Sequence, residues 1–467
     1  MITTPYILEL GVGALMLLVF GAGVLARRSV GMLATVGVLV LAAGAFALAP
    51  SGPALGGTFV QDGLAIFAKR VFLAATFIGF LAGLGSPDRA MARRGTEYHL
   101  LLLASLLGML VLASARDIIV LFVAFELMSI PLYVLSGFLK RQEEAVEAAL
   151  KFFLVGSVSS AVLVYGLSFV YGAVRSTDLA TVAQASTGIQ PFLTLGLLTA
   201  FAGFAFKIAA FPFHMWVPDT YEAASTPFVA WLSVAPKAAG FVALFRVYLE
   251  GAGDRAATWI PLAAGLATIT IVGGNLMALP QQNTKRLLAY SGIAHIGYML
   301  VGFAAASASG VAMVLFYLVT YVFGNMGAFL VVEALARAEG SEATTAFRGL
   351  AQRSPLLALA MLIFLLSLGG VPFVAGFWAK LYVFWAAASV GLYWLVLVGA
   401  VLTVVALFYY LVVAKRMYIE PPERPERVRL STTLALAVLL CVAGVVVLGV
   451  YPTPLVMAAL RAAAPLF

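Results

Sequence analysis

The sequence predicts an all-α integral membrane protein, on three observations. Its 467 residues are 63% hydrophobic and only 10% charged, whereas a soluble domain typically carries about 25% charged residues. The apolar residues form continuous runs, which favours helices over the alternating strands of a membrane barrel. Many runs approach the roughly 20 residues that a helix needs to cross a bilayer.

We expect about fourteen membrane-spanning helices, joined mostly by short loops. The first apolar run has no charged start and no cleavage site behind it, so we expect it to be retained as a helix. The predicted segments are 5–25, 30–50, 62–84, 97–114, 117–138, 148–173, 192–222, 227–250, 257–279, 286–304, 308–334, 355–386, 391–418 and 431–450.

Segments 7 and 12 carry helix-breaking residues. The first contains Pro212 and Pro218, and the second contains Gly369, Gly370 and Pro372. In lipid, the backbone groups that a proline leaves free are tolerated where they face protein or a wet cavity. The two segments are an odd number of helices apart, so they cross in opposite directions. This predicts two inverted five-helix repeats, segments 4–8 and 9–13, with a site at their interface; alternatively, the prolines simply kink two ordinary membrane helices.

The repeats imply four regions along the chain. We expect an N-terminal three-helix segment at 1–96, and a C-terminal helix with its tail at 421–467. Between them would lie the two half-channel repeats, at 97–250 and 251–420.

The net charge of +8 is explained by topology, and no nucleic-acid partner is expected. Lys69, Arg70 and Arg116 are among the few basic residues assigned to the side of the membrane opposite the odd-numbered loops. Positively charged loops stay in the cytoplasm, so both chain ends are expected outside it. The basic residues of the odd-numbered loops lie at 27–28, 89–94, 140–141, 285–286, 337–353 and 415–429.

Four charged residues fall deep inside the predicted spans, away from the segment ends: Glu126, Lys207, Lys237 and Lys380. A charge at the bilayer centre costs about 2.5–3.5 kcal/mol on insertion scales, so each needs a reason to be there. They could be structural ion pairs in an inert scaffold. They could also form a relay, because a buried lysine can be poised between its charged and neutral forms, and a nearby carboxylate changes its proton affinity.

Two histidines could extend that relay. His214 follows the break in segment 7 and His295 lies in the middle of segment 10. Histidine titrates near neutral pH, although a single histidine on an apolar helix is as often a hydrogen-bonded packing residue. Near the segment ends, Lys151 is expected as an interfacial anchor, and Glu9 and Glu333 are expected to face headgroups.

Several chemistries lack a motif in this chain. There is neither a phosphate-binding loop nor a dinucleotide-binding glycine motif after a strand. The single cysteine, Cys441, cannot build an iron–sulfur site. We therefore expect no cofactor in this chain, and its energy must come from an ion gradient or from a partner.

Four motifs resemble a known family. They are FELMSIPLYVLSGF, KIAAFPFHMWVPDTYEAASTP, GNLMALPQQNTKRLLAYSGIAHIGYM and LSLGGVPFVAGFWAKLYVF. They resemble the antiporter-like membrane subunits of respiratory complex I, which are related to multi-subunit cation/proton antiporters. KRLLAYSGIAHIGYM and the run ending in LFYYLVV are similar to the subunit N subfamily of bacterial NADH–quinone oxidoreductases.

That resemblance implies a proton channel through Glu126, Lys207, Lys237 and Lys380. It also implies a supporting role for three further residues, Lys151, His295 and Lys285. One departure is that segment 13 has no mid-membrane counterpart of Lys237, so the second half-channel would depend on His295 and water.

The resemblance also implies a large complex in a bacterial inner membrane. NADH, FMN, iron–sulfur clusters and a quinone would be used in other subunits. This chain would lie beside sister antiporter-like subunits and a small three-helix subunit. A cation/proton antiporter subunit, a membrane-bound hydrogenase subunit and a non-pumping scaffold are the alternatives.

Overall fold

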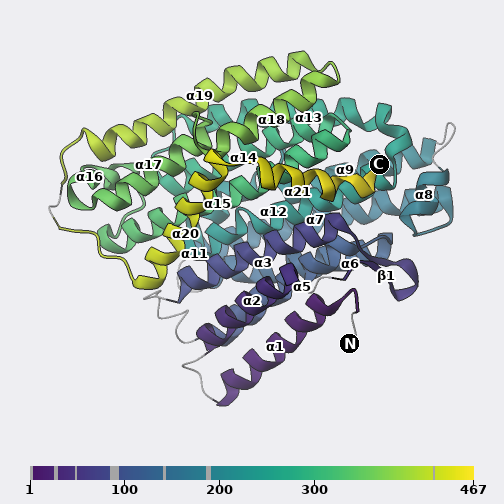
Figure 1. The fold of residues 1–467 in the computed structure, drawn as a ribbon, viewed down its shortest axis with the longest axis horizontal. Helices are drawn as coiled ribbons and strands as arrows, with labels where there is room; N and C mark the ends of the chain where they lie inside the picture. Colours follow the sequence, from purple (N-terminus) through teal and green to yellow (C-terminus); the bar gives the residue numbers. More distant parts are fainter. Residues whose placement is uncertain are drawn as a thin grey trace.

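The computed structural model describes residues 4–25, 30–47, 50–84, 94–139, 143–185, 191–423 and 426–467. Within these ranges the chain is helical except for a short hairpin of β1 (Gly52–Ala54) and β2 (Phe59–Gln61) and the connecting loops. The N-terminal helices α1 and α2 lie along one edge of the molecule, and α19 lies along the opposite edge (Figure 1).

Thirteen spans in the described part of the chain are long and apolar enough to cross a membrane. Twelve of them are dominated by one helix each, and one, Thr226–Glu250, is composite. The twelve helices are α1 (Ile7–Leu25), α2 (Val30–Ala47), α3 (Gly63–Gly83), α5 (Gly95–Ser114), α6 (Ile118–Ser136), α7 (Glu143–Val174), α9 (Pro191–Ile208), α13 (Ala256–Ala278), α14 (Thr284–Ala304), α15 (Ala308–Glu339), α19 (Tyr393–Tyr418) and α20 (Thr432–Val450).

The remaining predicted span, segment 12, consists of two half-helices, so the all-α membrane fold with about fourteen spans is confirmed. These are α17 (Pro355–Gly369) and α18 (Ala375–Ser389). The short elements are η1 (Leu55–Gly57), α8 (Leu179–Ala185), α10 (Trp216–Ala223), α11 (Thr226–Leu232), α12 (Ala235–Leu244), η2 (Phe245–Glu250), η3 (Gly253–Arg255), η4 (Thr344–Phe347), α16 (Leu350–Arg353), α21 (Thr453–Ala463) and η5 (Ala464–Leu466).

Both predicted interruptions are present. In segment 7 the chain leaves helix after Ile208 and resumes it at Trp216. In segment 12 α17 is capped by Gly370, whose φ of +79° is a left-handed conformation that glycine adopts without strain. Segment 8 contains a third break, between α11 and α12, that we did not predict. Pro236, in the first turn of α12, is a residue in the sequence that favours the start of a new helix there.

Close helix packing depends on small residues. A Cβ atom at Gly166 of α7 would lie 2.4 Å from the amide nitrogen of Ala200 on α9. A Cβ atom at Gly274 of α13 would lie 2.5 Å from the amide nitrogen of Ala294 on α14. Without side chains at these glycines the paired backbones approach closely, as is common between membrane helices. Helix α15 lies near the centre of the bundle, packed against α14, α17, α18 and α20 (Figure 1).

Several basic loop residues used to predict the orientation lie outside the described residues, so the topology stays a prediction. They are Arg27, Arg28, Arg89, Arg93, Lys140, Arg141 and Arg424.

The structure corrects the assignment of Lys69 and Glu9. Lys69 is not a loop residue: it lies within α3, fully buried, and its Nζ is 2.6 Å from a carboxylate oxygen of Glu9 on α1. It also donates a hydrogen bond to Gln61. Glu333 is likewise buried, and it pairs with Arg337 at 2.6 Å. Glu9 and Glu333 are therefore held by ion pairs in the protein.

Arg246 is the centre of a second buried ionic cluster. Its guanidinium makes two hydrogen bonds to the Asp62 carboxylate, at 2.6 and 2.7 Å, and one to Glu250 at 2.9 Å. Glu250 also pairs with Arg116. Burial alone would raise the pKa of Asp62, but the hydrogen bonds and charge of Arg246 hold it below its usual range. The cluster fastens the start of α3 to η2.

We expect Asp62→Asn to lower the stability of the protein, because it leaves the buried Arg246 charge undercompensated. Removing one partner of a buried ion pair costs about 3–5 kcal/mol, which thermal unfolding of the purified protein in detergent would report. Glu423→Gln is the matched control, since Glu423 pairs with Arg348 at the surface.

The lowered pKa also sets the pH range of this effect. The Asp62 contribution is fully present above the unfolded aspartate pKa of about 3.9 and is lost only as the pH falls through the lower folded value. The difference between Asp62→Asn and the parent should therefore be constant between pH 5 and pH 8. A difference no larger than that of Glu423→Gln would contradict a stabilising role.

Candidate functional site

Five ionisable residues of the predicted site lie inside the helical bundle, on five different helices. Lys207, Lys237, His295 and Lys380 are each less than 5% exposed, and Glu126 is half-buried. The helices that carry them are α6 for Glu126, α9 for Lys207, α12 for Lys237, α14 for His295 and α18 for Lys380.

Glu126 and Lys207 hydrogen-bond to serine hydroxyls. Neither forms an ion pair within the part of the chain that the structure describes. Ser160 of α7 donates to the Glu126 carboxylate at 2.5 Å. The Lys207 ammonium donates to Ser129 at 2.8 Å, and Ser129 in turn donates to the carbonyl of Phe125. Ser129 lies three residues after Glu126, hence on the same face of α6. That spacing could have identified Ser129 from the sequence as a neighbour of Glu126.

Lys237 lies in the first turn of α12, directly after the break in segment 8. Its Nζ is 5.3 Å from the centre of the Tyr221 ring and has no hydrogen-bond partner among the residues that the structure describes. A Cβ atom at Gly240, three residues further along α12, would lie 3.5 Å from Cγ of Lys207. The side chain of Lys207 therefore passes the same turn of α12 that carries Lys237.

His295 is surrounded by hydroxyl groups from three helices. Its Nδ1 is 2.7 Å from the hydroxyl of Tyr317, and its Nε2 is 3.3 Å from the hydroxyl of Tyr410. Tyr410 is also 2.5 Å from Ser291 Oγ. Segment 13, which has no mid-membrane lysine, thus contributes the Tyr410 hydroxyl. Ser291 and His295 lie four residues apart on one face of α14, a spacing that marks Ser291 as a neighbour.

Lys380 lies against the break in segment 12. Its Nζ is 3.4 Å from the carbonyl oxygen of Gly369, at the end of α17, where helix carbonyls lack helical partners and carry partial negative charge. The same Nζ is 4.7 Å from the centre of the Tyr298 ring, which in turn lies 6.0 Å from the His295 ring.

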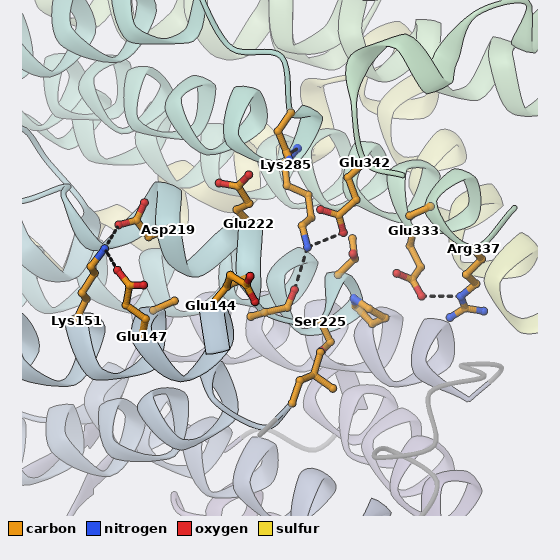
Figure 2. A pocket seen from close by; sticks show the side chains of 18 residues that line it. Glu144, Glu147, Lys151, Asp219, Glu222, Ser225, Lys285, Glu333, Arg337 and Glu342 are labelled. Carbon is orange, nitrogen blue, oxygen red and sulfur yellow. Dashed lines mark hydrogen bonds and ion pairs between the residues drawn. The ribbon is translucent and has the colours of Figure 1, made fainter. Parts of the chain in front are cut away.

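Lys151 and Lys285 are not part of this interior row. Both line a cavity of about 810 Å³ at one end of the bundle (Figure 2). Lys151, half exposed, pairs with Glu147 at 2.7 Å and with Asp219 at 3.0 Å. Lys285 pairs with Glu342 at 2.8 Å and donates to the carbonyl of Ala224.

Acidic side chains dominate the lining of this cavity. The basic residues in it are Lys151, Lys285 and Arg337. The acidic ones are Glu144, Glu147, Asp219, Glu222, Glu333 and Glu342 (Figure 2). A negative mouth of this kind raises the local concentration of cations, protons included.

His214 lines a separate cavity of about 430 Å³, stacked on Phe211 with ring centres 4.6 Å apart. Its contacts among the described residues do not reach Lys207 or Lys237. Asp219, however, lines both this cavity and the acidic one. His214 is therefore placed near the mouth and apart from the interior row.

The described residues contain no group of three or more His, Cys, Asp and Glu side chains arranged to hold a metal ion. Within that part of the chain the site consists of ionisable and hydroxyl side chains in a protein interior. Such groups can bind, hold and pass protons.

Comparisons with known protein families, sequences and structures all indicate the same family. Residues 115–406 match the family described as NADH:quinone oxidoreductase/Mrp antiporter, transmembrane. NADH-quinone oxidoreductase subunit N of Moorella thermoacetica is 42% identical over 445 residues, covering 94% of this chain and 93% of the relative.

Two solved structures illustrate the fold similarity. A chain of respiratory complex I from Thermus thermophilus is 32% identical, with a TM-score of 0.83 over 97% of this chain and 99% of that chain. A chain of the Mrp complex from Dietzia is 22% identical, with a TM-score of 0.87 over 98% and 97% of the two chains, and shows the shared fold. This chain therefore belongs to the NADH:quinone oxidoreductase/Mrp antiporter family of transmembrane subunits.

Proposed function

We propose that this chain is the proton-translocating membrane subunit N of an NADH–quinone oxidoreductase. The observation that carries the proposal is the row of Glu126, Lys207, Lys237, His295 and Lys380 in the bundle interior. Keeping three lysines there costs free energy, and no ion pair within 4 Å compensates any of the three among the described residues. The high identity to relatives named subunit N supports the same assignment.

In the proposed mechanism, protons move between neighbouring members of the row. A shift of the Glu126 carboxylate toward or away from Lys207 changes how strongly the lysine holds its proton. The released proton passes to Lys237, then through the hydroxyl cluster at His295 to Lys380. Serine and tyrosine hydroxyls suit the intermediate positions because each can both accept and donate a hydrogen bond.

We further propose that the row is formed by two inverted half-channels, residues 97–250 and 251–420. The first contains interruptions in segments 7 and 8, beside Lys207 and Lys237, and the second contains one in segment 12, beside Lys380. The regions 1–96 and 421–467 would then be peripheral supports. The packing of α20 against α3 and α15 is compatible with that role.

The acidic cavity is the proposed mouth for proton exchange with the predicted cytoplasmic side. Lys151, Lys285 and His214 would take supporting positions there, since two of them line the cavity and the third adjoins Asp219. Arg286 links this region to α14, because its guanidinium pairs with Asp219 at 2.8 Å and with Glu222 at 2.9 Å.

The remaining assignments follow from the proposed complex. Sister antiporter-like subunits and a small three-helix subunit would be the membrane partners. NADH, FMN, iron–sulfur clusters and a quinone would be bound by other subunits. The location would be a bacterial inner membrane, with both chain ends outside the cytoplasm.

A cation/proton antiporter subunit is the second candidate, because the chain shares its fold with the Mrp complex. A membrane-bound hydrogenase subunit is a related alternative. Identities of about 40% to many proteins named subunit N, against 22% to the Mrp chain, favour the oxidoreductase. Redox subunits that co-purify with this chain, and the substrate they oxidise, would separate these candidates.

We expect Lys237→Met to reduce NADH-driven proton pumping sharply while the complex still assembles. The change removes the titratable group from the middle of the row but keeps a long apolar side chain. Pumping would be measured with a pH-sensitive dye in vesicles that contain the whole complex, and assembly by native electrophoresis. Lys415→Met, at an exposed position near the end of α19, is the matched control and should pump normally. Unchanged pumping in an assembled Lys237→Met complex would favour the scaffold interpretation.

Ser129→Ala should have a smaller effect of the same kind. It removes the hydroxyl that accepts the hydrogen bond of Lys207. A hydrogen bond to a charged group contributes about 1.5–3 kcal/mol, so proton transfer through Lys207 is expected to slow roughly tenfold or more. The measurement is pumping per NADH oxidised. Ser168→Ala, whose exposed hydroxyl bonds only to its own helix at Tyr165, should leave that ratio unchanged; equal effects of the two changes would exclude a role for Ser129.

A further inference from the structure

Two buried polar atoms lie close together between Lys237 and His295 without hydrogen-bond partners among the described residues. They are Nζ of Lys237 and the hydroxyl oxygen of Tyr321. A buried polar group without a hydrogen bond destabilises the fold, so two in one place require an explanation.

Gly292 of α14 lies against both of these atoms. A Cβ atom at this glycine would be 2.7 Å from the Tyr321 hydroxyl and 3.4 Å from Lys237 Nζ. Both polar atoms therefore face the same small volume, yet they are not hydrogen-bonded to each other. Any side chain at position 292 would enter that volume.

Two aromatic rings lie nearby. The centre of the Tyr221 ring is 5.3 Å from Lys237 Nζ. On the far side, the Tyr321 ring is 5.2 Å from the ring of His295. Tyr321 thus lies between Lys237 and the histidine.

We propose that Gly292 keeps a binding site for one water molecule, held by Lys237 and Tyr321, and that Tyr321 is an additional member of the relay. A buried water needs two to four polar partners, and these two side chains supply the smallest such set. The inference rests on the proposed proton-translocating function and deepens it.

The transfer across this site balances without any outside reactant. The Lys237 ammonium gives a proton to the water, which gives one of its own to the Tyr321 hydroxyl. Tyr321 releases its original proton into the hydroxyl cluster around His295, where the hydroxyl of Tyr317 or Tyr410, each beside a ring nitrogen, passes one on to the imidazole. Only N–H and O–H bonds break and form: Lys237 becomes neutral, His295 becomes charged, and the water and the tyrosines end unchanged. In this scheme Gly292 is a positioning residue.

The test compares Gly292→Ala and Tyr321→Phe in the intact complex. The first fills the water site, and the second removes one of its hydrogen-bonding groups. We expect each to slow proton transfer through this subunit by about a hundredfold or more, the range in which positioned proton-transfer groups act, with the complex assembled. The matched controls are Gly265→Ala, at a glycine with no atom within 4 Å of its Cβ position, and Tyr165→Phe, at an exposed tyrosine. Both should pump normally.

The double variant Gly292→Ala/Tyr321→Phe separates a relay from simple packing. If Gly292 only avoids a clash with the Tyr321 hydroxyl, removing that hydroxyl restores pumping, and this result would overturn the proposal. If the water site carries protons, the double variant stays as defective as the single ones. High-resolution density for the parent complex should also contain a water within hydrogen-bond distance of Lys237 Nζ and the Tyr321 hydroxyl, absent in Gly292→Ala; a dry site in the parent would overturn the proposal as well.

Lys237→Met in the same series separates a failure of the proposed water site from a failure of the proposed proton-translocating function. If it abolishes pumping while Gly292→Ala and Tyr321→Phe pump normally, the water site is refuted and the proposed function stands. If Lys237→Met also pumps normally, the proposed function fails at this position.

Discussion

The cost of keeping charge away from water governs this structure. The bundle compensates buried charges in two different ways. Arg246 and Lys69 are fully buried but tied to carboxylates at short distances, Arg246 to Asp62 and Lys69 to Glu9. Lys207 and Lys237 have no such counter-ion within ion-pair distance among the described residues. A lysine in a short ion pair holds its proton firmly, whereas one surrounded by hydroxyls and aromatic faces can release it.

The helix breaks belong to the same arrangement. A continuous helix satisfies its own backbone, so it offers no polar backbone group to a neighbouring side chain. Where segments 7, 8 and 12 are interrupted, Lys207 ends a helix, Lys237 begins one, and Lys380 approaches the free carbonyl of Gly369. Each interior lysine therefore lies at or beside a break, and at Lys380 the partial negative charge of a backbone carbonyl takes the place of a full counter-charge.

Hydroxyl groups fill the intervals between these lysines. Ser129, Ser160, Tyr317 and Tyr410 are neutral, so they add no fixed charge to the interior, but each carries a proton and can accept another hydrogen bond. Glycine leaves space for polar groups because it has no side chain, as at Gly292, which lies against Lys237 and Tyr321. Ion-paired clusters and hydroxyl-lined lysines thus divide the buried charges into those that hold helices together and those suited to moving protons.

The sequence by itself determined the membrane class, the approximate spans, the interruptions in segments 7 and 12, and the three interior lysines Lys207, Lys237 and Lys380, because hydropathy, proline and intramembrane charge are local signals. It did not determine which buried charges are paired. Lys69 and Glu9 looked interfacial and Arg246 received no role, since their partners lie on distant helices. The contributions of Ser160, Tyr321 and Tyr410 likewise depend on which helices become neighbours. Only the tertiary structure decides that, because helix packing is set by shape complementarity over the whole bundle and not by any single segment.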